Sequence, residues 1–258
     1  MISFKKALLA TATAGCLLSG SAMADPFQVT VTNNAPNGGT YITPVWVGFH
    51  DGSFDTFSAG DTASAGVESV AEVGQTGTLS GEFAGSGVDA TIGGAPIAPG
   101  ASASGIFNLA NDGSNNYLSF ASMILPSSDF FIGNDDPLAY SIAALLNGNT
   151  SSVSFTVATV YDAGTEENDF LFSAGNGLFP GLPASDAPNG NDQALPIAVA
   201  SGADFASFLN VGAFDTRGLN FDNYVSLATI EVSAVPVPAA LPLLLSAVGG
   251  LGFMRRFS

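Results

Sequence analysis

The chain has 258 residues, of which 47% are hydrophobic, and its 22 acidic residues against five Lys and Arg give a formal net charge of −17. All the acids lie between Asp25 and Glu231, whereas four of the five cations lie near the two ends of the chain. This balance excludes nucleic acid as a partner, because binding phosphates requires many Lys and Arg side chains.

The first 24 residues have the layout of a secretory signal peptide. A Lys pair at residues 5–6 precedes an apolar segment, and Ala22-Met23-Ala24 supplies the small residues of a cleavage site. We expect cleavage before Asp25, which would remove Cys16 and leave a mature protein with no disulfide. A lipoprotein signal at Cys16 is the alternative that this segment leaves open.

Residues 25–232 form the body of the protein, and their length fits one domain of β-sandwich size. The clearest strand is residues 27–33, FQVTVTN, where apolar and polar side chains alternate. Residues 40–49 are expected to form the next strand, with Pro44 at an edge or bulge because it cannot donate a ladder hydrogen bond.

Further along the body, the apolar spacing over residues 63–73 predicts a short helix, and a helical turn is expected at 204–210. Glycine is frequent from 77 to 105, where we expect at most short strands. The remaining expected strands are 117–125, 152–164 and 224–234. Many strands joined by turns, with one or two short helices, predict an all-β fold, an antiparallel β-sandwich.

Acidic residues follow two of these strands. Asp129 comes just after the strand that ends at Leu125, and Asp162 and Glu166 follow the strand that ends at Val160-Tyr161. The D-x-G-x-E spacing can bend so that its carboxylates converge, and oxygen ligands without His or Cys suit calcium better than zinc. The alternative is that these acids are simply solvated in a very acidic protein.

The single histidine, His50, is the residue that a catalytic triad would require. No Gly-x-Ser-x-Gly elbow accompanies it, so we expect a structural role, with the ring hydrogen-bonded at a strand end. Trp46 is expected in the core.

Three stretches together resemble the N-terminal spondin domain, also known as the FS domain of F-spondin. They are HDGSFDTFSAGDTASAGVESVAEVG at 50–74, ILPSSDFFIGNDDPLAY at 124–140 and VYDAGTEEND at 160–169. The resemblance covers most of residues 25–232. It implies a β-sandwich related to calcium-binding membrane-targeting domains, with one calcium ion held by Asp129, Asp162 and Glu166. Glu166 stands where animal members have Asp, and its longer side chain could alter the coordination.

Residues 233–258 form a tail with its own pattern. Val235-Pro236-Val237-Pro238 precedes an apolar run at 239–254 and the basic pair Arg255-Arg256, which would act as a stop-transfer signal. This arrangement resembles the PEP-CTERM sorting signal, with Val237 in place of the usual Glu. The resemblance implies transient insertion of the tail into the inner membrane and cutting by an exosortase-like processing enzyme. A plain C-terminal membrane anchor is the alternative.

The sequence therefore predicts a secreted, non-enzymatic calcium-binding protein that works in adhesion or in the extracellular matrix, for instance of a biofilm, at the surface of a Gram-negative bacterium. Its expected partner is an exopolysaccharide or a surface protein. Two alternatives remain at this point: a carbohydrate-processing enzyme, and a passive acidic matrix protein with no specific site.

Overall fold

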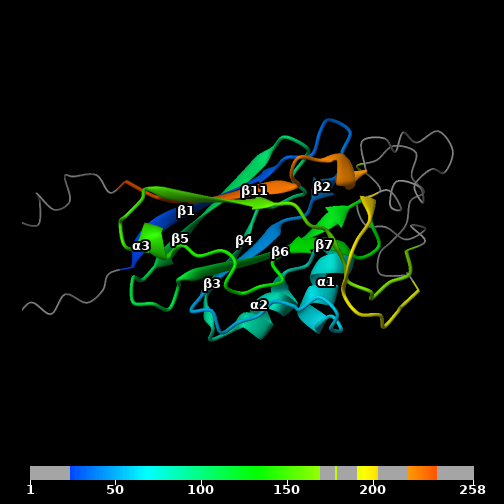
Figure 1. Ribbon diagram of the computed structural model, residues 1–258, viewed down its shortest axis with the longest axis horizontal. Coiled ribbons are helices and arrows are strands. Elements are labelled where there is room, and N and C mark those ends of the chain that lie inside the picture. Colours follow the sequence, from blue (N-terminus) through cyan, green and yellow to red (C-terminus); the bar gives the residue numbers. More distant parts are fainter. Residues whose placement is uncertain (1–23, 169–177, 179–190, 203–219, 237–258) are drawn as a thin grey trace, which may run out of the picture.

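The computed structural model describes residues 24–168, 178, 191–202 and 220–236. Two antiparallel sheets face each other across the core, which makes the fold an all-β sandwich (Figure 1). The smaller sheet has the order β5-β1-β11-β8, and its strands are β1 (Asp25–Asn33), β5 (Ser102–Leu109), β8 (Ser152–Val157) and β11 (Ala228–Ala234).

The larger sheet has the order β10-β9-β7-β6-β3-β4, with β2 paired to β6. Its strands are β2 (Tyr41–Ile42), β3 (Val45–His50), β4 (Gly87–Ile92), β6 (Tyr117–Leu125), β7 (Phe130–Gly133), β9 (Tyr161–Asp162) and β10 (Ala198–Val199). β3 and β6 are neighbours in its interior and are buried along almost their whole length.

The core between the sheets follows from the alternation in β1. Phe27, Val29 and Val31 point inward, and the register with β11 pairs Val29 with Val232 and Val31 with Ile230, which are also buried. The side chains between them in β1 are polar and only partly buried. One face of the small sheet therefore faces the core and the other faces solvent.

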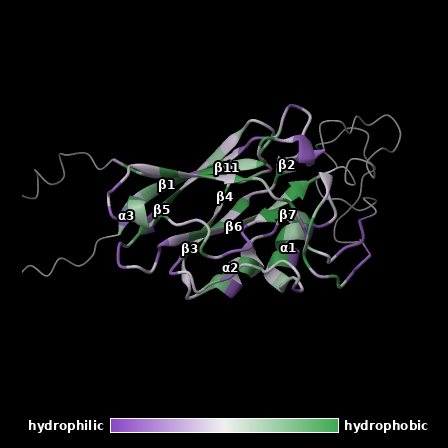
Figure 2. Cartoon of the chain, in the orientation of Figure 1, coloured by the Kyte–Doolittle hydropathy of each residue, from purple (hydrophilic) through white to green (hydrophobic). Residues whose placement is uncertain are grey.

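Two helices cover the outer face of the large sheet (Figures 1 and 2). Helix α1 (Ala65–Val73) begins at Ser64, whose hydroxyl accepts a hydrogen bond from Val67 N, and ends at Gly74 in the left-handed conformation. Helix α2 (Gly77–Phe83) follows directly, and its Phe83 packs edge-on against Trp46 of β3. A third helix, α3 (Ala143–Leu146), and the turn η3 (Phe221–Asn223) lie in connections.

Several sequence expectations need correction in detail. The expected strand at 40–49 is split, because Pro44 interrupts the ladder between β2 and β3, and the strand expected at 152–164 ends at Val157 and resumes only as β9. Helix α2 and the eight-residue β5 lie in the region where at most short strands were expected. Periodicity is weak there because both faces of β4, and much of β5, are exposed.

The two ends of the described body lie together at one pole of the sandwich, where Phe27 pairs with Ala234 (Figure 1). The expected signal peptide, the helical turn at 204–210 and the apolar tail lie outside the described residues. None of the helices in the described part of the chain has the length and hydrophobicity that a membrane span needs.

Candidate functional site

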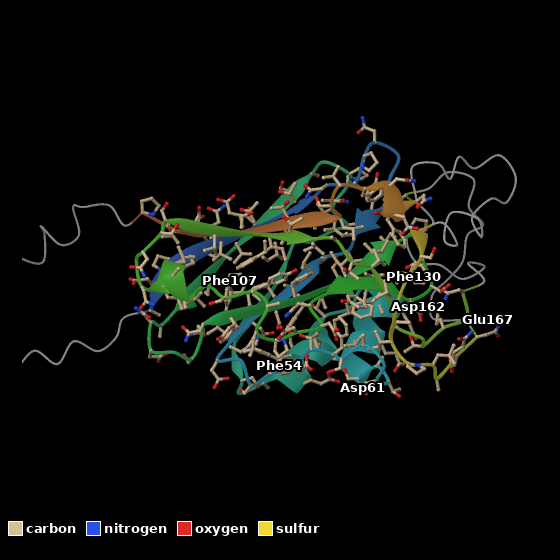
Figure 3. All side chains as sticks on the ribbon, in the orientation of Figure 1. Phe54, Asp61, Phe107, Phe130, Asp162 and Glu167 are labelled. Atoms are coloured by element: carbon tan, nitrogen blue, oxygen red, sulfur yellow. The ribbon has the colours of Figure 1, made fainter. Side chains whose placement is uncertain are left out.

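The acidic residues singled out in the sequence lie at the pole opposite the chain ends, where β7 and β9 run side by side (Figures 1 and 3). Asp129 directly precedes β7, and Asp162 is the last residue of β9. Phe130 and Asp162 are paired across the two strands, and Ala163 N donates to Asp129 O at 3.2 Å. This pairing brings the start of β7 against the loop that follows β9.

The Asp129 side chain is fully buried, with 0% of its surface exposed. Its Oδ2 accepts hydrogen bonds from the backbone N–H groups of Thr165, at 2.8 Å, and Glu166, at 3.1 Å. Its Oδ1 is also buried and has no hydrogen-bond partner among the described residues. A buried acceptor without a donor costs about 1–3 kcal/mol, and more when it is charged, so this oxygen needs an explanation.

The loop after β9 is shaped so that its N–H groups reach Asp129. Asp162 Oδ1 accepts from Gly164 N at 2.8 Å, and its Oδ2 accepts from Asn168 Nδ2 at 2.6 Å. Gly164 has φ 68°, and a Cβ added there would lie 2.5 Å from Leu195 O, so both the conformation and the space require glycine. The turn at Gly164 directs the next two N–H groups at Asp129.

A second segment closes the outer side of this loop. Glu166 forms an isolated β-bridge with Asp192 and is only 2% exposed. Gln193 N donates to Thr165 O at 2.6 Å. The structure thus places Asp129, Asp162 and the backbone of Glu166 within one small region.

The electrostatics of this region disfavour its negative charge. Burial, and after it the neighbouring Asp162 carboxylate, raise the pKa of Asp129 to about 7, although the two backbone hydrogen bonds from Glu166 and Thr165 oppose the rise. No Lys or Arg occurs anywhere in the described residues, so no positively charged side chain described here compensates these carboxylates.

One functional neighbour was missed in the sequence. Glu72 of α1 adds to the raised pKa of Asp129, and its own pKa is raised, chiefly by burial, while a hydrogen bond from the Thr165 side chain opposes this. The helical pattern at 63–73 placed Glu72 on a helix but could not show that the helix packs beside this loop. Only the tertiary arrangement reveals it.

The arrangement favours a hard cation. A buried carboxylate oxygen without a donor, next to a second carboxylate, is a place where positive charge is stabilised. In the described part of the chain, however, no three His, Cys, Asp or Glu side chains are grouped as a ready-made metal cage. Further oxygen ligands would therefore have to come from backbone carbonyls, water or a small movement of the loop.

His50, the last residue of β3, lies in a separate buried network. Its Nδ1 accepts from Gly52 N at 3.0 Å, so the neutral ring carries its proton on Nε2, which lies 2.9 Å from Ser119 Oγ. Asn134 Nδ2 also donates to Ser119 Oγ. His50 and Ser119 are both 0% exposed, so this pair stabilises the sheet and is closed to a substrate.

Comparison with known families gives one match. Residues 28–176, more than half of the chain, match the model of a family described as Spondin_N. No curated protein shows significant sequence similarity to the chain. The matched region includes both β7 and the loop after β9, and therefore the whole buried carboxylate region.

Proposed function

The chain belongs to the Spondin_N family, which at family level indicates an extracellular protein without enzymatic activity, and from this we propose that it is a secreted calcium-binding protein of cell adhesion or of the extracellular matrix. In this proposal, Asp129, Asp162 and Glu166 bind one calcium ion. The ion fixes the loop after β9 to the start of β7.

The observation that carries the proposal is the state of Asp129. One of its oxygens is held by two backbone N–H groups, and the other is buried without a donor among the described residues. A cation beside Oδ1 would supply the missing partner and would offset the repulsion from Asp162. The residues present fit such an ion on both counts.

Calcium suits this donor set better than zinc or a transition metal. Oxygen is the only ligand atom that the three residues offer, and calcium accepts six to eight oxygens from carboxylates, carbonyls and water in flexible geometry. The bound ion would supply positive charge and would lock two segments together. The protein's own residues position the ligands. Gly164 shapes the loop so that the backbone N–H groups of Thr165 and Glu166 orient Asp129.

The site lies at the pole opposite the ends of the described body (Figure 1). We propose that residues 233–258 hold the protein at the inner membrane until an exosortase-like enzyme cuts near Val235-Pro236-Val237-Pro238. The end of the sandwich that carries the proposed calcium site would then point away from that membrane. Mass spectrometry of the surface fraction tests this part, because an intact tail on the mature protein would replace sorting with simple anchoring.

Isothermal titration of the full chain with calcium tests the site. We expect one saturable binding event that is lost in Asp162→Asn, a variant that keeps the acceptor for Gly164 N. Asp112→Asn is the matched control, because Asp112 Oδ1 accepts from Ser114 N in the same way but is exposed and lies elsewhere. Many weak equivalents, unchanged in both variants, would instead indicate a passive acidic protein.

A further inference from the structure

A polar cleft of about 520 Å³ lies at the pole of the sandwich where the two ends of the described body meet (Figure 1). Its walls include the segment 85–88, together with Asp51 and Asn115, which lie in the connections after β3 and β5. Ala24 also lines the cleft, and it is the last residue of the expected signal peptide. Removal of that peptide before Asp25 therefore changes what the cleft contains.

The cleft is lined by a polar side chain whose hydrogen bonds are incomplete. Asn115 is only 3% exposed. Its Nδ2 donates to Ala110 O at 3.3 Å and to Ser114 Oγ at 2.8 Å, so the amide is held in one orientation. Its Oδ1 is buried and has no hydrogen-bond partner among the described residues. A buried amide oxygen of this kind calls for a donor.

The small sheet holds the start of β1 beside this amide. Asp25 pairs with Leu109 of β5, and the next residue along that chain is Ala110, whose carbonyl accepts from Asn115 Nδ2. On the other side, the carbonyl of the residue after Asp25 accepts from Val235 N at 3.0 Å. A chain end is ordered when its first residues belong to a sheet. The backbone nitrogen of Asp25 is therefore fixed at the edge of the cleft.

Processing would change the charge at this point. Hydrolysis of the peptide bond before Asp25 leaves a carboxylate on the released peptide and an ammonium group on Asp25. This amine would be the single primary amine of the processed chain, because both Lys residues of the sequence are at 5–6. The charged groups around it are the carboxylates of Asp25 itself, of Asp51 in the cleft and of Asp112 in the loop before Asn115. A positive charge is therefore favoured here.

We propose that the α-ammonium group of Asp25, formed when the signal peptide is removed, binds in this cleft and donates to Asn115 Oδ1 and to the Asp51 carboxylate. An ammonium group has three donors and no acceptor, which matches a buried carbonyl oxygen beside a carboxylate. The unprocessed chain offers one uncharged amide N–H at the same place. The occupant of the cleft is thus the protein's own terminus, and processing completes this pole. The inference rests on the proposed export of the chain and uses none of the proposed calcium ligands.

The test uses the chain expressed with its signal peptide, exported, and purified in EDTA. Mass spectrometry should show Asp25 as the first residue. Because the processed protein has one primary amine, the pH dependence of its acetylation rate reports the pKa of that group alone. We expect this pKa to lie about one unit above the ordinary α-amino value of about 7.7–8.0.

Asp51→Asn keeps the acceptor for Ser53 N but removes the charge, and it should lower the pKa of the amine by about half a unit. Asp112→Asn is the matched control, because Asp112 Oδ1 accepts from Ser114 N in the same way but Asp112 does not line the cleft. It should leave the pKa almost unchanged. A pKa that falls equally in both variants would overturn the proposal, because it would reflect the general field of an acidic protein.

Complete acetylation of the amine gives a second measurement. It should lower the melting temperature of the processed wild type by about 2–4 °C, and it should have little effect in Asn115→Ala, whatever the starting stability of that variant. An ordinary pKa in a protein that begins at Asp25, or a melting temperature that acetylation leaves unchanged, would overturn the proposal and leave the calcium function standing. A different first residue would overturn it together with the expected cleavage before Asp25.

Discussion

Replacing Asp129 by Asn should stabilise the calcium-free protein and should abolish the further stabilisation that calcium gives the wild type. The Asn side chain is nearly the same size, and its oxygen can still accept the two N–H groups of Thr165 and Glu166. Its amide group carries no charge and would stand where Oδ1 has no donor among the described residues. The substitution therefore removes the buried charge and little else.

The size of the effect follows from the pKa of Asp129, which burial and Asp162 raise from 3.8 to about 7. Because a change of one pKa unit corresponds to about 1.4 kcal/mol, ionising Asp129 in the folded protein costs about 4 kcal/mol of stability at pH 8. The folded pKa lies above the unfolded value, so this stability is fully present below pH 3.8 and is lost as pH rises through 7. Asp129→Asn should therefore gain up to about 4 kcal/mol at pH 8 in EDTA and almost nothing at pH 4.

Calcium opposes this gain. A ligand at 100 times its dissociation constant stabilises the folded state by about 2.7 kcal/mol, and the wild type should gain this while Asp129→Asn should not, so the advantage of the variant at pH 8 should shrink to about 1 kcal/mol. At about 1,000 times the dissociation constant, where the ligand contributes about 4.1 kcal/mol, the two proteins should be equally stable. Urea unfolding at pH 4 and pH 8, with EDTA or calcium, measures all four values, and Asp112→Asn serves as the control for losing an exposed carboxylate. Loss of stability in Asp129→Asn at pH 8 in EDTA would refute the reasoning.

Three further predictions concern the surroundings of the site. Gly164→Ala should destabilise the protein by about 1–3 kcal/mol and weaken calcium binding, because the added Cβ meets Leu195 O. Urea unfolding measures the stability and calorimetric titration measures the binding; a variant with wild-type values would contradict the role of this turn. Glu72→Gln keeps a hydrogen-bond acceptor for the Thr165 side chain but removes a negative charge. It should therefore lower the pKa of Asp129 and reduce the pH dependence of stability in EDTA. An unchanged pH profile would show that the Glu72 charge does not affect the pKa of Asp129. Burial lowers the pKa of His50, so its contribution to stability is present above pH 6.5 and is lost as pH falls below that value. His50→Gln should therefore make the stability of the protein depend less on pH in this range. A stronger pH dependence in the variant would contradict the direction of the His50 shift.

The local sequence pattern was sufficient to locate the strands that bury one face or that are buried along their whole length. The alternation of β1 and the apolar run of β6 gave their positions, and the spacing over 63–73 gave α1. The same reasoning failed where side chains on both faces are exposed, as in β4, and where a short amphipathic segment such as α2 is held mainly by tertiary contacts of Leu79 and Phe83. Periodicity reports burial, and it carries no signal when burial does not alternate.

The carboxylate region shows a similar division. The sequence placed Asp129 and Asp162 after their strands, but only the pairing of β7 with β9 shows that the two ends meet. The contribution of Glu72 could not be predicted, because it depends on how α1 packs across the outer face of the large sheet.

The most direct test of the calcium site is a crystal structure of the protein grown in calcium, with an anomalous difference map calculated at this end of the sandwich. We predict a single strong peak in contact with Asp129 Oδ1 and with carboxylate oxygens of the loop at 162–166. A map with no peak there, and with Asp129 Oδ1 bonded only to water or to a protein donor, would contradict the account.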